Sequence, residues 1–542
     1  MPNPRSFHLA TLGCKVNQYE SQALREAWIA QGCAESADPA GAEVVVVNSC
    51  AVTAGAVADL RQLVARVRRA NPAVRIVVTG CAAQAVRGEV EAIAGVDAIV
   101  PQAGKGALLA GLPLGNLRTR PGEPAGAAAS AAATSVEAPD AAIEETEISY
   151  QSPWRREPGL GHGTSSPRTA GNTIPTDATP LAAPRSATMP PAPPEGDSPR
   201  IPRRNEPGPE GEPSSPRTAQ PSAESPVPES SSRRGRRAYP AFEVTASPRA
   251  RAQVKVQDGC SHGCTYCIVP LARGGPASRE PAAVLEECRR LLAAGWRELV
   301  LSGINLRQYR ADKRNFWGLL RFLEEALAPE WAGRARLRLS SLDPGQLGGE
   351  ALDTLAASRL LCPHLHLSLQ AGSPGVLARM NRAHYGPDDV LDFLAGLGRA
   401  WPRFGLGADL LAGFPGETDA EFAETLALAT ALPLTYAHVF PFSPRPGTPA
   451  AALPGQLPPE AKKERAAALR RLAGRKKAAF LSRLLELEEL AMVLEDPATG
   501  RGTCQFGADC RLDRVPAGAA ARALVRVRPA GLAQSGLQVE AR

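Results

Sequence analysis

Apolar positions along the first 118 residues recur with two alternating periods, one typical of strands and one typical of helices. Short apolar runs predict strands at about 7–12, 44–47 and 75–79. Helical periodicity follows at about 21–31 and 55–70. The run of four valines at 44–47 is typical of a strand that is buried on both faces. Such alternation predicts a parallel sheet, so we expect residues 1–118 to form a Rossmann- or flavodoxin-like α/β domain.

The same alternation returns at residue 246 and continues to about residue 475. Predicted strands lie at 253–257, 298–302, 336–340, 364–369, 405–410 and 436–440. Predicted helices lie at 281–294, 316–327, 349–358, 373–380, 388–400 and 419–430. Six β/α repeats predict a (β/α)6 partial TIM barrel over 246–475, whose reactive groups lie in the loops after the strands.

The C-terminal part of the chain combines a basic helix with a β-like pattern. The helix is expected at about 460–485, and its basic residues include Lys462, Lys463, Arg465, Arg470, Arg471, Arg475, Lys476 and Lys477. Alternation in 486–542 predicts a small β-barrel, and we assign 476–542 to this last domain. Basic side chains neutralise phosphates and a barrel face can hold a loop, so the region suits an RNA partner. The alternative for the helix is a solvated connector.

Residues 119–245 differ sharply in composition from the segments on either side. They hold 23 of the 51 prolines and contain neither cysteine nor lysine. Such a segment cannot bury enough apolar area to offset its ordering entropy, so we expect disorder. An arginine-rich run at 233–237 could touch RNA phosphates, but a solvated charge run is the more common role of such tracts.

Length, charge and cysteine number narrow the class of protein. A chain of 542 residues predicts roughly three domains, and a net charge of +7 permits a nucleic-acid partner without requiring one. Eleven cysteines, an odd number, argue against a disulfide framework and suit a reducing, cytoplasmic compartment. The N-terminus lacks the apolar run of a signal peptide, and no apolar stretch is long enough to predict a membrane span.

Cys260, Cys264 and Cys267 form the most informative motif in the chain. Their CxxxCxxC spacing is typical of thiolate ligands of an iron–sulfur cluster. Three thiolates on a four-iron cluster leave one iron open to a cofactor, and the spacing resembles that of the radical S-adenosylmethionine (SAM) enzymes. The alternative is a structural zinc site, which prefers four ligands and for which only His262 lies within the loop.

A second set of cysteines, Cys14, Cys50 and Cys81, follows three predicted strands. Loops after parallel strands converge at one edge of the sheet, where ligands bind. We therefore expect the three thiolates to meet and to hold a second cluster. The alternative is three separate buried structural cysteines, which are common.

Several motifs resemble those of the radical SAM methylthiotransferases, and more narrowly the MtaB-type branch that acts on N6-threonylcarbamoyladenosine in tRNA. The N-terminal matches are TLGCKVNQYES (11–21), NSCAVT (48–53) and TGCAAQ (79–84). Those in the expected barrel are CTYCIVP (264–270), ARG (272–274), SR (278–279), HLSLQAGS (366–373), MNR (380–382), DLLAGFPGET (409–418) and FPFSPRPGTP (440–449). The C-terminal barrel resembles the family's TRAM domain only weakly, and the long 119–245 insertion departs from the family pattern.

The resemblance implies two [4Fe-4S] clusters, SAM as cofactor and a tRNA substrate. The cluster on Cys260, Cys264 and Cys267 would reduce SAM to a 5′-deoxyadenosyl radical, which abstracts hydrogen from the substrate carbon. The cluster on Cys14, Cys50 and Cys81 would deliver sulfur, and a second SAM would supply the methyl group. The expected substrate is N6-threonylcarbamoyladenosine 3′ of the anticodon, which would become its 2-methylthio derivative.

Weaker candidates for contact with SAM lie near these motifs. The expected cofactor-binding residues are Tyr266, Ser302, Gly303, Asn305, Gln370, Asp409 and Arg273. Tyr266 has loop packing as its alternative. Arg279 and Arg445 could reach a SAM carboxylate or an RNA phosphate, and Glu417 suits a helix entry equally well. We expect core packing for Cys33, Cys288 and Cys362, and core or supporting roles for His8, His364, His366 and His438. A metal site at Cys504 and Cys510 is disfavoured, because no further ligand follows them.

Expected partners are the tRNA anticodon loop and an electron donor of flavodoxin or ferredoxin type, with no membrane and a monomeric state. Two related activities remain open: methylthiolation of isopentenyl-adenosine in tRNA, and of an aspartate in a ribosomal protein. Lys15-Val16-Asn17, rather than Gln-Met-Asn, disfavours the first. The basic C-terminal region disfavours the second. A non-catalytic iron–sulfur module that binds RNA is disfavoured by the polar residues expected at the barrel strand ends.

Overall fold

The computed structural model describes residues 5–52, 54–113, 239 and 242–542 of the chain. Most of the segment expected to be disordered, including the arginine run at 233–237, lies outside these residues. The end of that segment is packed, however: Phe242 and Val244 are each 2% exposed beside Tyr19 and Ala23. For residues 242–245 the prediction of disorder was therefore wrong, because their apolar side chains cover one face of α1.

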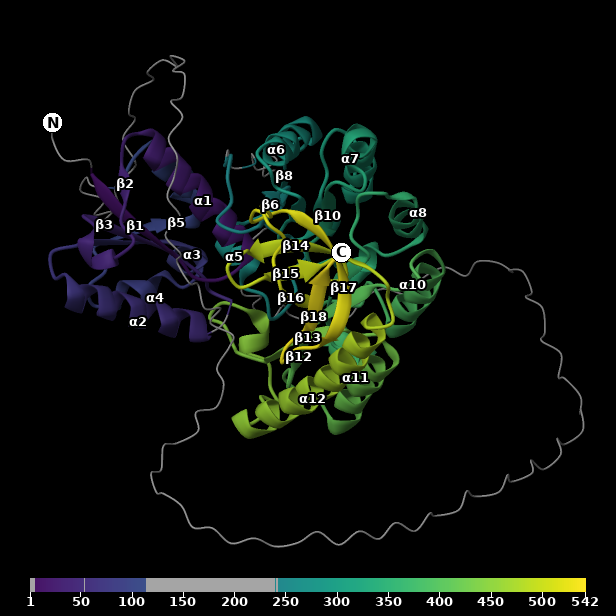
Figure 1. The fold of residues 1–542 in the computed structure, drawn as a ribbon. Coiled ribbons are helices and arrows are strands. Elements are labelled where there is room, and N and C mark those ends of the chain that lie inside the picture. Colours follow the sequence, from purple (N-terminus) through teal and green to yellow (C-terminus); the bar gives the residue numbers. More distant parts are fainter. Residues whose placement is uncertain (1–4, 53, 114–238, 240–241) are drawn as a thin grey trace, which may run out of the picture. The chain divides into compact units, whose positions relative to one another are not determined.

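The N-terminal residues form a five-stranded parallel sheet in the order β2-β1-β3-β4-β5 (Figure 1). The strands are β1 (Ser6–Thr11), β2 (Ala34–Glu35), β3 (Val44–Ser49), β4 (Arg75–Gly80) and β5 (Ala98–Pro101). The helices are α1 (Lys15–Ala30), α2 (Ala54–Ala70), α3 (Cys81–Ala85) and α4 (Arg87–Glu91). Val44 and Val46 pack in one core with Trp28, whereas Val45 and Val47 pack in another with Leu60. The valine run is thus buried on both faces, which confirms the predicted α/β domain.

The central residues form six parallel strands arranged as a part-barrel. They are β6 (Arg251–Lys255), β9 (Glu298–Ser302), β10 (Arg336–Leu339), β11 (His364–Gln370), β12 (Gly405–Ala412) and β13 (Tyr436–Pro441). Two three-stranded sheets, β10-β9-β6 and β11-β12-β13, are joined by bridges between Leu337 and Leu361 and between Leu342 and Leu367. The helices between strands are α6 (Pro281–Ala293), α7 (Phe316–Trp331), α8 (Gly349–Ala357), α9 (Pro374–Arg379), α10 (Pro387–Ala400) and α11 (Asp419–Ala431). All six predicted β/α repeats are confirmed.

Alternation along the barrel strands separates an apolar outer face from a polar inner face. Leu299, Leu337 and Leu365 are buried in the main core with the helices. The intervening residues bond to one another across strands: Glu298 accepts from Arg336 and Arg338 at 2.6 Å each, and Asp409 is 3.0 Å from Nε2 of His366. A side-chain period of two along each strand causes this division. The inner face can therefore hold polar chemistry.

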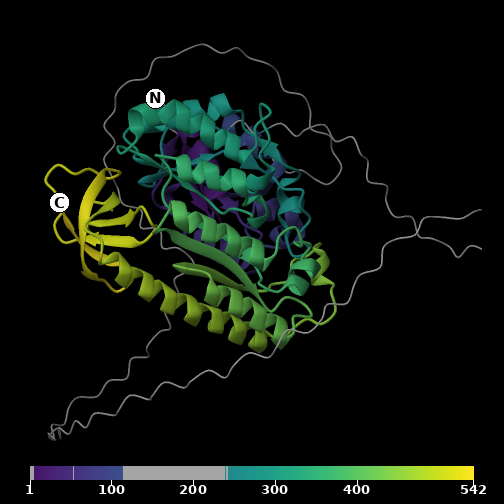
Figure 2. The same cartoon turned by 90° about the vertical axis from the view of Figure 1, so that its right-hand side faces the viewer.

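A long helix, α12 (Pro459–Leu484), leads into a closed five-stranded barrel, as Figure 2 shows. The strands are β14 (Leu490–Asp496), β15 (Arg501–Cys504), β16 (Asp509–Leu512), β17 (Leu524–Leu532) and β18 (Leu537–Ala541). Arg336 donates to the carbonyls of Ala491 and Thr503 at 2.7 and 2.9 Å, so this small barrel contacts the inner-face arginines of β10. The basic helix and the small barrel are both confirmed.

Among the described residues, none of the helices combines the length and apolar character needed to cross a membrane.

Candidate active site: two cysteine triads

Cys14, Cys50 and Cys81 lie at one edge of the N-terminal sheet. Cys14 is the N-cap of α1, Cys50 directly follows β3, and Cys81 begins α3 immediately after β4. Since β1, β3 and β4 are neighbours and parallel, their carboxyl ends bring the three sulfurs together. Burial, and then the neighbouring Cys14 and Cys81, raise the pKa of Cys50 to about 12. We call these three residues the N-terminal triad.

Glycines allow this close approach of the strand-end loops. Gly13 has φ +111°, and a Cβ there would lie 2.6 Å from Cβ of Cys50. Gly80 has φ +97°, and a Cβ there would lie 2.4 Å from the carbonyl oxygen of Ser49. Any larger residue would both strain the backbone and push the loops apart. The Gly-Cys pairs at 13–14 and 80–81 are therefore a packing requirement of the triad.

Cys260, Cys264 and Cys267 lie in the loop after β7 (Gln257–Asp258), and we call them the barrel triad. Polar groups surround their sulfurs. The backbone N–H of His262 and Nδ2 of Asn305 lie 3.4 and 3.5 Å from Sγ of Cys260. Nη1 of Arg382 lies 3.4 Å from Sγ of Cys264. Burial raises the pKa of Cys267 to about 12 and also raises that of Cys264, whereas Arg382 opposes the shift at Cys264. These donors favour the thiolate forms that bind iron.

A set of three cysteines suits a structural zinc ion less well than an iron–sulfur cluster, because structural zinc prefers four protein ligands. Tetrahedral zinc with Zn–S bonds of about 2.3 Å would hold its sulfurs about 3.8 Å apart. In the described part of the chain, the only group of three or more ligand atoms within 4.8 Å of one another is His366, Asp409 and His438. Neither cysteine triad forms such a compact group among the described residues. His262 packs its ring against His384, with centroids 4.3 Å apart.

Arg445 offers a place for an anionic group of a cofactor. Its side chain is 3% exposed, and its Nε and Nη2 atoms have no hydrogen-bond partner among the described residues. Arg445 precedes residues that contact the barrel-triad loop, since the N–H of Ala450 donates to the carbonyl of Thr265 at 2.9 Å. A buried, unpaired guanidinium is costly unless an anion binds to it. The carboxylate of SAM has the charge and the planar shape that would satisfy it.

A short helix connects the two triads. It is α5 (Val269–Arg273), which begins two residues after Cys267. Ile268 and Ala272 pack in the same core as Cys81. Six residues in helical or loop conformation span at most about 20 Å. The chain that leaves the barrel triad therefore packs within a few residues against the core that contains Cys81.

Arg273 was expected to contact SAM, and the structure places it in a buried ion-pair network. Its Nη1 lies 2.7 Å from Glu20 and 2.9 Å from Asp258, and its Nη2 donates to Asn17 at 2.7 Å. Lys105 and Lys255 also contact Glu20, at 2.6 and 2.8 Å. Burial alone would raise the pKa of Glu20, but Arg273 and the two lysines hold it well below its usual range. Arg279 is likewise paired with Glu287, and Tyr19 donates to the same carboxylate.

The other expected cofactor-binding residues lie around the barrel-triad loop and at strand ends. Asn305 contacts Cys260, and the backbone N–H groups of Ile304 and Asn305 donate to Gln257 at 3.0 and 2.8 Å. A Cβ on Gly303 would lie 2.7 Å from Leu306, so this turn packs tightly. Ser302 ends β9 and Gln370 ends β11 with φ +66°, while Tyr266 packs against the main core. Contacts of these residues with SAM stay predictions.

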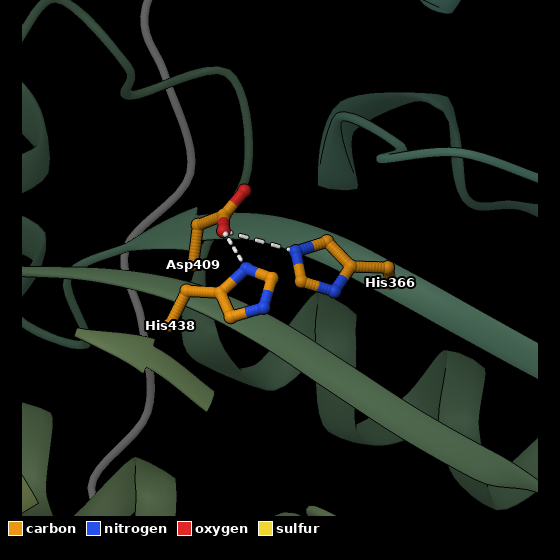
Figure 3. Close-up of side chains that lie close together, drawn as sticks. All are labelled: His366, Asp409 and His438. Carbon is orange, nitrogen blue, oxygen red and sulfur yellow. Dashed lines mark hydrogen bonds and ion pairs between the residues drawn. The ribbon is translucent and has the colours of Figure 1, made fainter. Parts of the chain in front are cut away.

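Asp409 belongs to a hydrogen-bonded group on the inner face of the barrel (Figure 3). Its Oδ1 lies 3.0 Å from Nε2 of His366 and 3.2 Å from Nδ1 of His438. Tyr436 links His366 to His364 through two contacts of 3.0 Å. Although burial would raise the pKa of Asp409, the two histidines hold it well below its usual range. The carboxylate is therefore ionised and lies within hydrogen-bond distance of two imidazole rings.

Arg382 is a functional candidate to which the sequence analysis gave no role. It is 5% exposed, contacts Cys264, and is 2.9 Å from Asp343 and 2.8 Å from the carbonyl of Ser368. The signal was available, because the residue belongs to the MNR motif at 380–382. Its partners, however, come from β11 and from the loop after β10, and only the fold reveals them.

The remaining expectations concern groups away from the triads. Cys288 and Cys362 are 0% and 3% exposed, which confirms core packing, and Cys33 is partly buried beside a core. Cys504 and Cys510 lie in the core of the small barrel. Glu417 immediately precedes Thr418, the N-cap of α11, and accepts from the N–H of Gly413 at 2.7 Å and from Arg465. Glu417 therefore has a structural role at a helix entry.

Comparison with known proteins agrees with this geometry. Residues 6–101 match the uncharacterized protein family UPF0004, and residues 254–429 match the Radical SAM superfamily. A tRNA-2-methylthio-N(6)-dimethylallyladenosine synthase from Pelotomaculum thermopropionicum is 39% identical over 225 residues, covering 41% of this chain and 49% of that protein.

Two relatives match over most of their length. The threonylcarbamoyladenosine tRNA methylthiotransferase MtaB of Bacillus subtilis is 30% identical over 463 residues, covering 85% of this chain and 78% of that protein. The protein of the same description from Treponema pallidum is 32% identical over 483 residues, covering 88% of each chain. The chain belongs to the family of the MtaB-type radical SAM methylthiotransferases.

Proposed function

We propose that this enzyme converts N6-threonylcarbamoyladenosine 3′ of the tRNA anticodon into its 2-methylthio derivative. The observation that carries the proposal is the pair of cysteine triads, one on the N-terminal sheet and one on the part-barrel, connected by α5. Replacement of an aromatic C–H by a methylthio group needs a cofactor for the hard step, because no side chain can remove that hydrogen. The chain supplies a separate ligand set for each of two clusters.

The groups that bind at these triads would supply reductive cleavage of SAM at the barrel triad and sulfur transfer at the N-terminal triad. The chain's own residues position them. Arg382 donates to the sulfur of Cys264, and Asn305 and the N–H of His262 donate to the sulfur of Cys260. Arg445 offers an unpaired guanidinium to an anion near the same loop. The Arg273–Glu20 network fixes α5 against α1, and so sets the relation of the two triads.

Basic surfaces on α12 and on the small barrel support an RNA substrate. Lys463, Arg471 and Arg475 are exposed on α12. Other basic residues of the helix are used in packing, since Arg465 pairs with Glu417 and Lys476 donates to the carbonyls of Thr430 and Leu432. The exposed subset provides charges that phosphates can neutralise.

Arg501 and Arg511 add a more specific feature. They are direct cross-strand partners on β15 and β16, and both are exposed. Like charges directly opposite in an antiparallel pair are destabilising. Arg501 also lies opposite Asp496 of β14, whereas Arg511 forms no ion pair among the described residues. A phosphate bound between Arg501 and Arg511 would contact both guanidinium groups and offset their repulsion.

The finer features of the function are also proposals. The anticodon loop suits the site, because an enzyme that modifies a base must reach it outside a stacked duplex. Thiolate ligands need a reducing compartment, which supports action in the cytoplasm. An external one-electron donor of flavodoxin or ferredoxin type completes the electron balance. We propose that the enzyme works as a monomer.

The test of the function is mass spectrometry of tRNA nucleosides from cells with and without the gene. The expected result is loss of 2-methylthio-N6-threonylcarbamoyladenosine and accumulation of its unmodified precursor. Complementation with the wild-type gene should restore the product, whereas a Cys50→Ala variant, expressed to the same level, should not. An unchanged nucleoside profile would contradict the tRNA assignment. If the 2-methylthio derivative of isopentenyl-adenosine is lost instead, the enzyme belongs to the branch that acts on that nucleoside.

A further inference from the structure

Lys15 lies where the first turn of α1 meets the inner face of the part-barrel. It is the first residue of α1 and directly follows Cys14 of the N-terminal triad. Side chains three positions apart share one face of a helix, and Gln18 lies 3.2 Å from Gln253 on β6. Farther along both elements, Glu20 of α1 lies 2.8 Å from Lys255 of β6. Continuing this register backwards directs Lys15 toward the inner-face position of Arg251.

The positive charges of Arg251 and Arg338 act on Lys15, and the carboxylate of Asp409 is the acidic group that opposes them. No acidic residue occurs in the first turn of α1, and a cation at a helix N-terminus opposes the helix dipole. Within the described chain, no hydrogen bond or ion pair involves the Lys15 side chain. An anion in front of Lys15 would compensate the positive charges, interact favourably with the N-terminus of α1 and give the ammonium group a bonding partner.

Water and a ligand can reach this part of the inner face. Lys15 is exposed to solvent, and the side chain of His438 is 57% exposed. Asp409 is the nearby acidic group, but its carboxylate is already bound by His366 and His438 (Figure 3). It therefore opposes the entry of an anion less than a free carboxylate would. The exposed imidazole of His438 adds a hydrogen-bonding group next to the ammonium.

We propose that Lys15 binds the carboxylate of the threonylcarbamoyl group on the substrate adenosine, and that it selects this substrate over adenosines with an uncharged N6 substituent. The inference rests on the proposed function and deepens it. N6 is the exocyclic nitrogen on C6 of the adenine ring, and C2 is separated from C6 by N1 alone. A base that presents C2 to the N-terminal triad therefore places its N6 substituent near the residue adjacent to Cys14.

Charge makes this selection strong. The threonylcarbamoyl group ends in a carboxylate, whereas the dimethylallyl group has no polar atom. A charge-assisted hydrogen bond that is lost on substitution corresponds to a change of about 10- to 100-fold in binding. With an apolar substituent, the ammonium would also be desolvated without a partner. A single lysine can thus both favour one substrate and reject another.

The test compares three anticodon stem–loops with the cluster-loaded enzyme: one with threonylcarbamoyladenosine, one with its threoninamide analogue, and one with unmodified adenosine. Affinity and kcat/KM are measured for the wild type, Lys15→Gln and Lys15→Arg. For the wild type we expect the acid to exceed the amide by about 10- to 100-fold. Lys15→Gln should lose this preference, and Lys15→Arg should retain most of it. The amide substrate tests the proposal even without a protein variant.

Controls separate a substrate contact from damage to the triad. Iron content and the 5′-deoxyadenosine formed without RNA should be the same in Lys15→Gln as in the wild type. Lys463→Gln, on the exposed face of α12, should weaken all three RNAs equally. If Lys15→Gln weakens the binding of all three RNAs equally, Lys15 contacts a phosphate and the proposal is overturned. Equal affinity of the wild type for the acid and the amide would also overturn the proposal. If the wild type binds the acid preferentially but methylthiolates none of the RNAs, the proposed function fails while this inference stands.

Discussion

The guanidinium of Arg273, at the end of α5, lies 2.7 Å from the carboxylate of Glu20 on α1. The two residues are separated by more than 250 positions in sequence and lie on different helices. Both side chains are almost completely buried, and Lys105, Lys255 and Asp258 complete the network. This contact ties the N-terminal triad to the helix that follows the barrel triad. The relation between the two triads therefore depends on one buried carboxylate and its cations.

Removing Arg273 should destabilise the protein. Arg273→Ala leaves Asp258 with fewer partners and opens a space beside Cys81, and breaking a buried pair costs about 3–5 kcal/mol. Denaturant unfolding of the cluster-free protein measures the loss. Arg87→Ala removes an exposed pair with Glu91 and should change the free energy of unfolding by less than about 0.5 kcal/mol. Equal effects of the two variants would refute the importance of the network.

The same network predicts a pH dependence. Since its neighbours hold the pKa of Glu20 well below its usual value of 4.5, the ionised network stabilises the folded state fully above that pH. The stabilisation should be lost progressively as the pH falls below 4.5. The difference in unfolding free energy between wild type and Arg273→Ala should therefore shrink in acid. A difference that stays constant from pH 7 to pH 3 would show that Glu20 does not carry it.

Each cysteine triad should account for half of the iron. Anaerobically reconstituted wild type is expected to hold about eight iron atoms, and Cys81→Ala or Cys264→Ala about four. Cys264→Ala should also abolish 5′-deoxyadenosine formation, whereas Cys81→Ala should retain it. Cys288→Ala, in the core away from both triads, is the matched control and should keep about eight. An unchanged iron content in Cys81→Ala would exclude the second cluster.

Arg445 should contribute to SAM binding. Arg445→Gln removes the unpaired buried guanidinium and should weaken SAM binding by about 10- to 100-fold, measured by equilibrium dialysis with the cluster-loaded enzyme. Without ligand, the variant should be at least as stable as the wild type, because an uncompensated buried charge has been removed. Arg403→Gln, at an exposed arginine paired with Glu486, provides the control. Unchanged SAM affinity with weaker tRNA binding would assign Arg445 to an RNA phosphate.

Arg501 and Arg511 should affect stability and RNA binding in opposite directions. Arg511→Gln relieves a like-charge cross-strand pair and should stabilise the small barrel by about 0.2–1 kcal/mol. The same change should reduce the slope of log affinity for tRNA against log salt by about 1, which corresponds to one phosphate contact. Arg526→Gln, which breaks an exposed pair with Glu489, should not stabilise the barrel. An unchanged salt slope for Arg511→Gln would exclude the phosphate contact.

Local sequence patterns predicted the elements well, because each element is specified by its own periodicity. The valine run of β3 and the alternating leucines of β9 to β11 predicted buried strands, and the structure confirms them. The start of α1 was misplaced: we expected residue 21, but the helix begins at Lys15. The first turns of α1 lack an apolar periodicity, because buried polar residues such as Asn17 and Glu20 occupy positions that face other parts of the chain.

The chain's sequence by itself determined which cysteines are proposed as cluster ligands, since CxxxCxxC spacing and strand-end cysteines indicate this chemistry without knowledge of distant contacts. It also determined the six β/α repeats through their periodicity. Only the tertiary structure decided that Arg273 joins a buried ion-pair network, that Arg382 donates to Cys264, and that Nε and Nη2 of Arg445 have no hydrogen-bond partner among the described residues. A sequence motif does not specify the partner of its arginine. The role of that arginine depends on which carboxylate or sulfur the fold brings within hydrogen-bond distance.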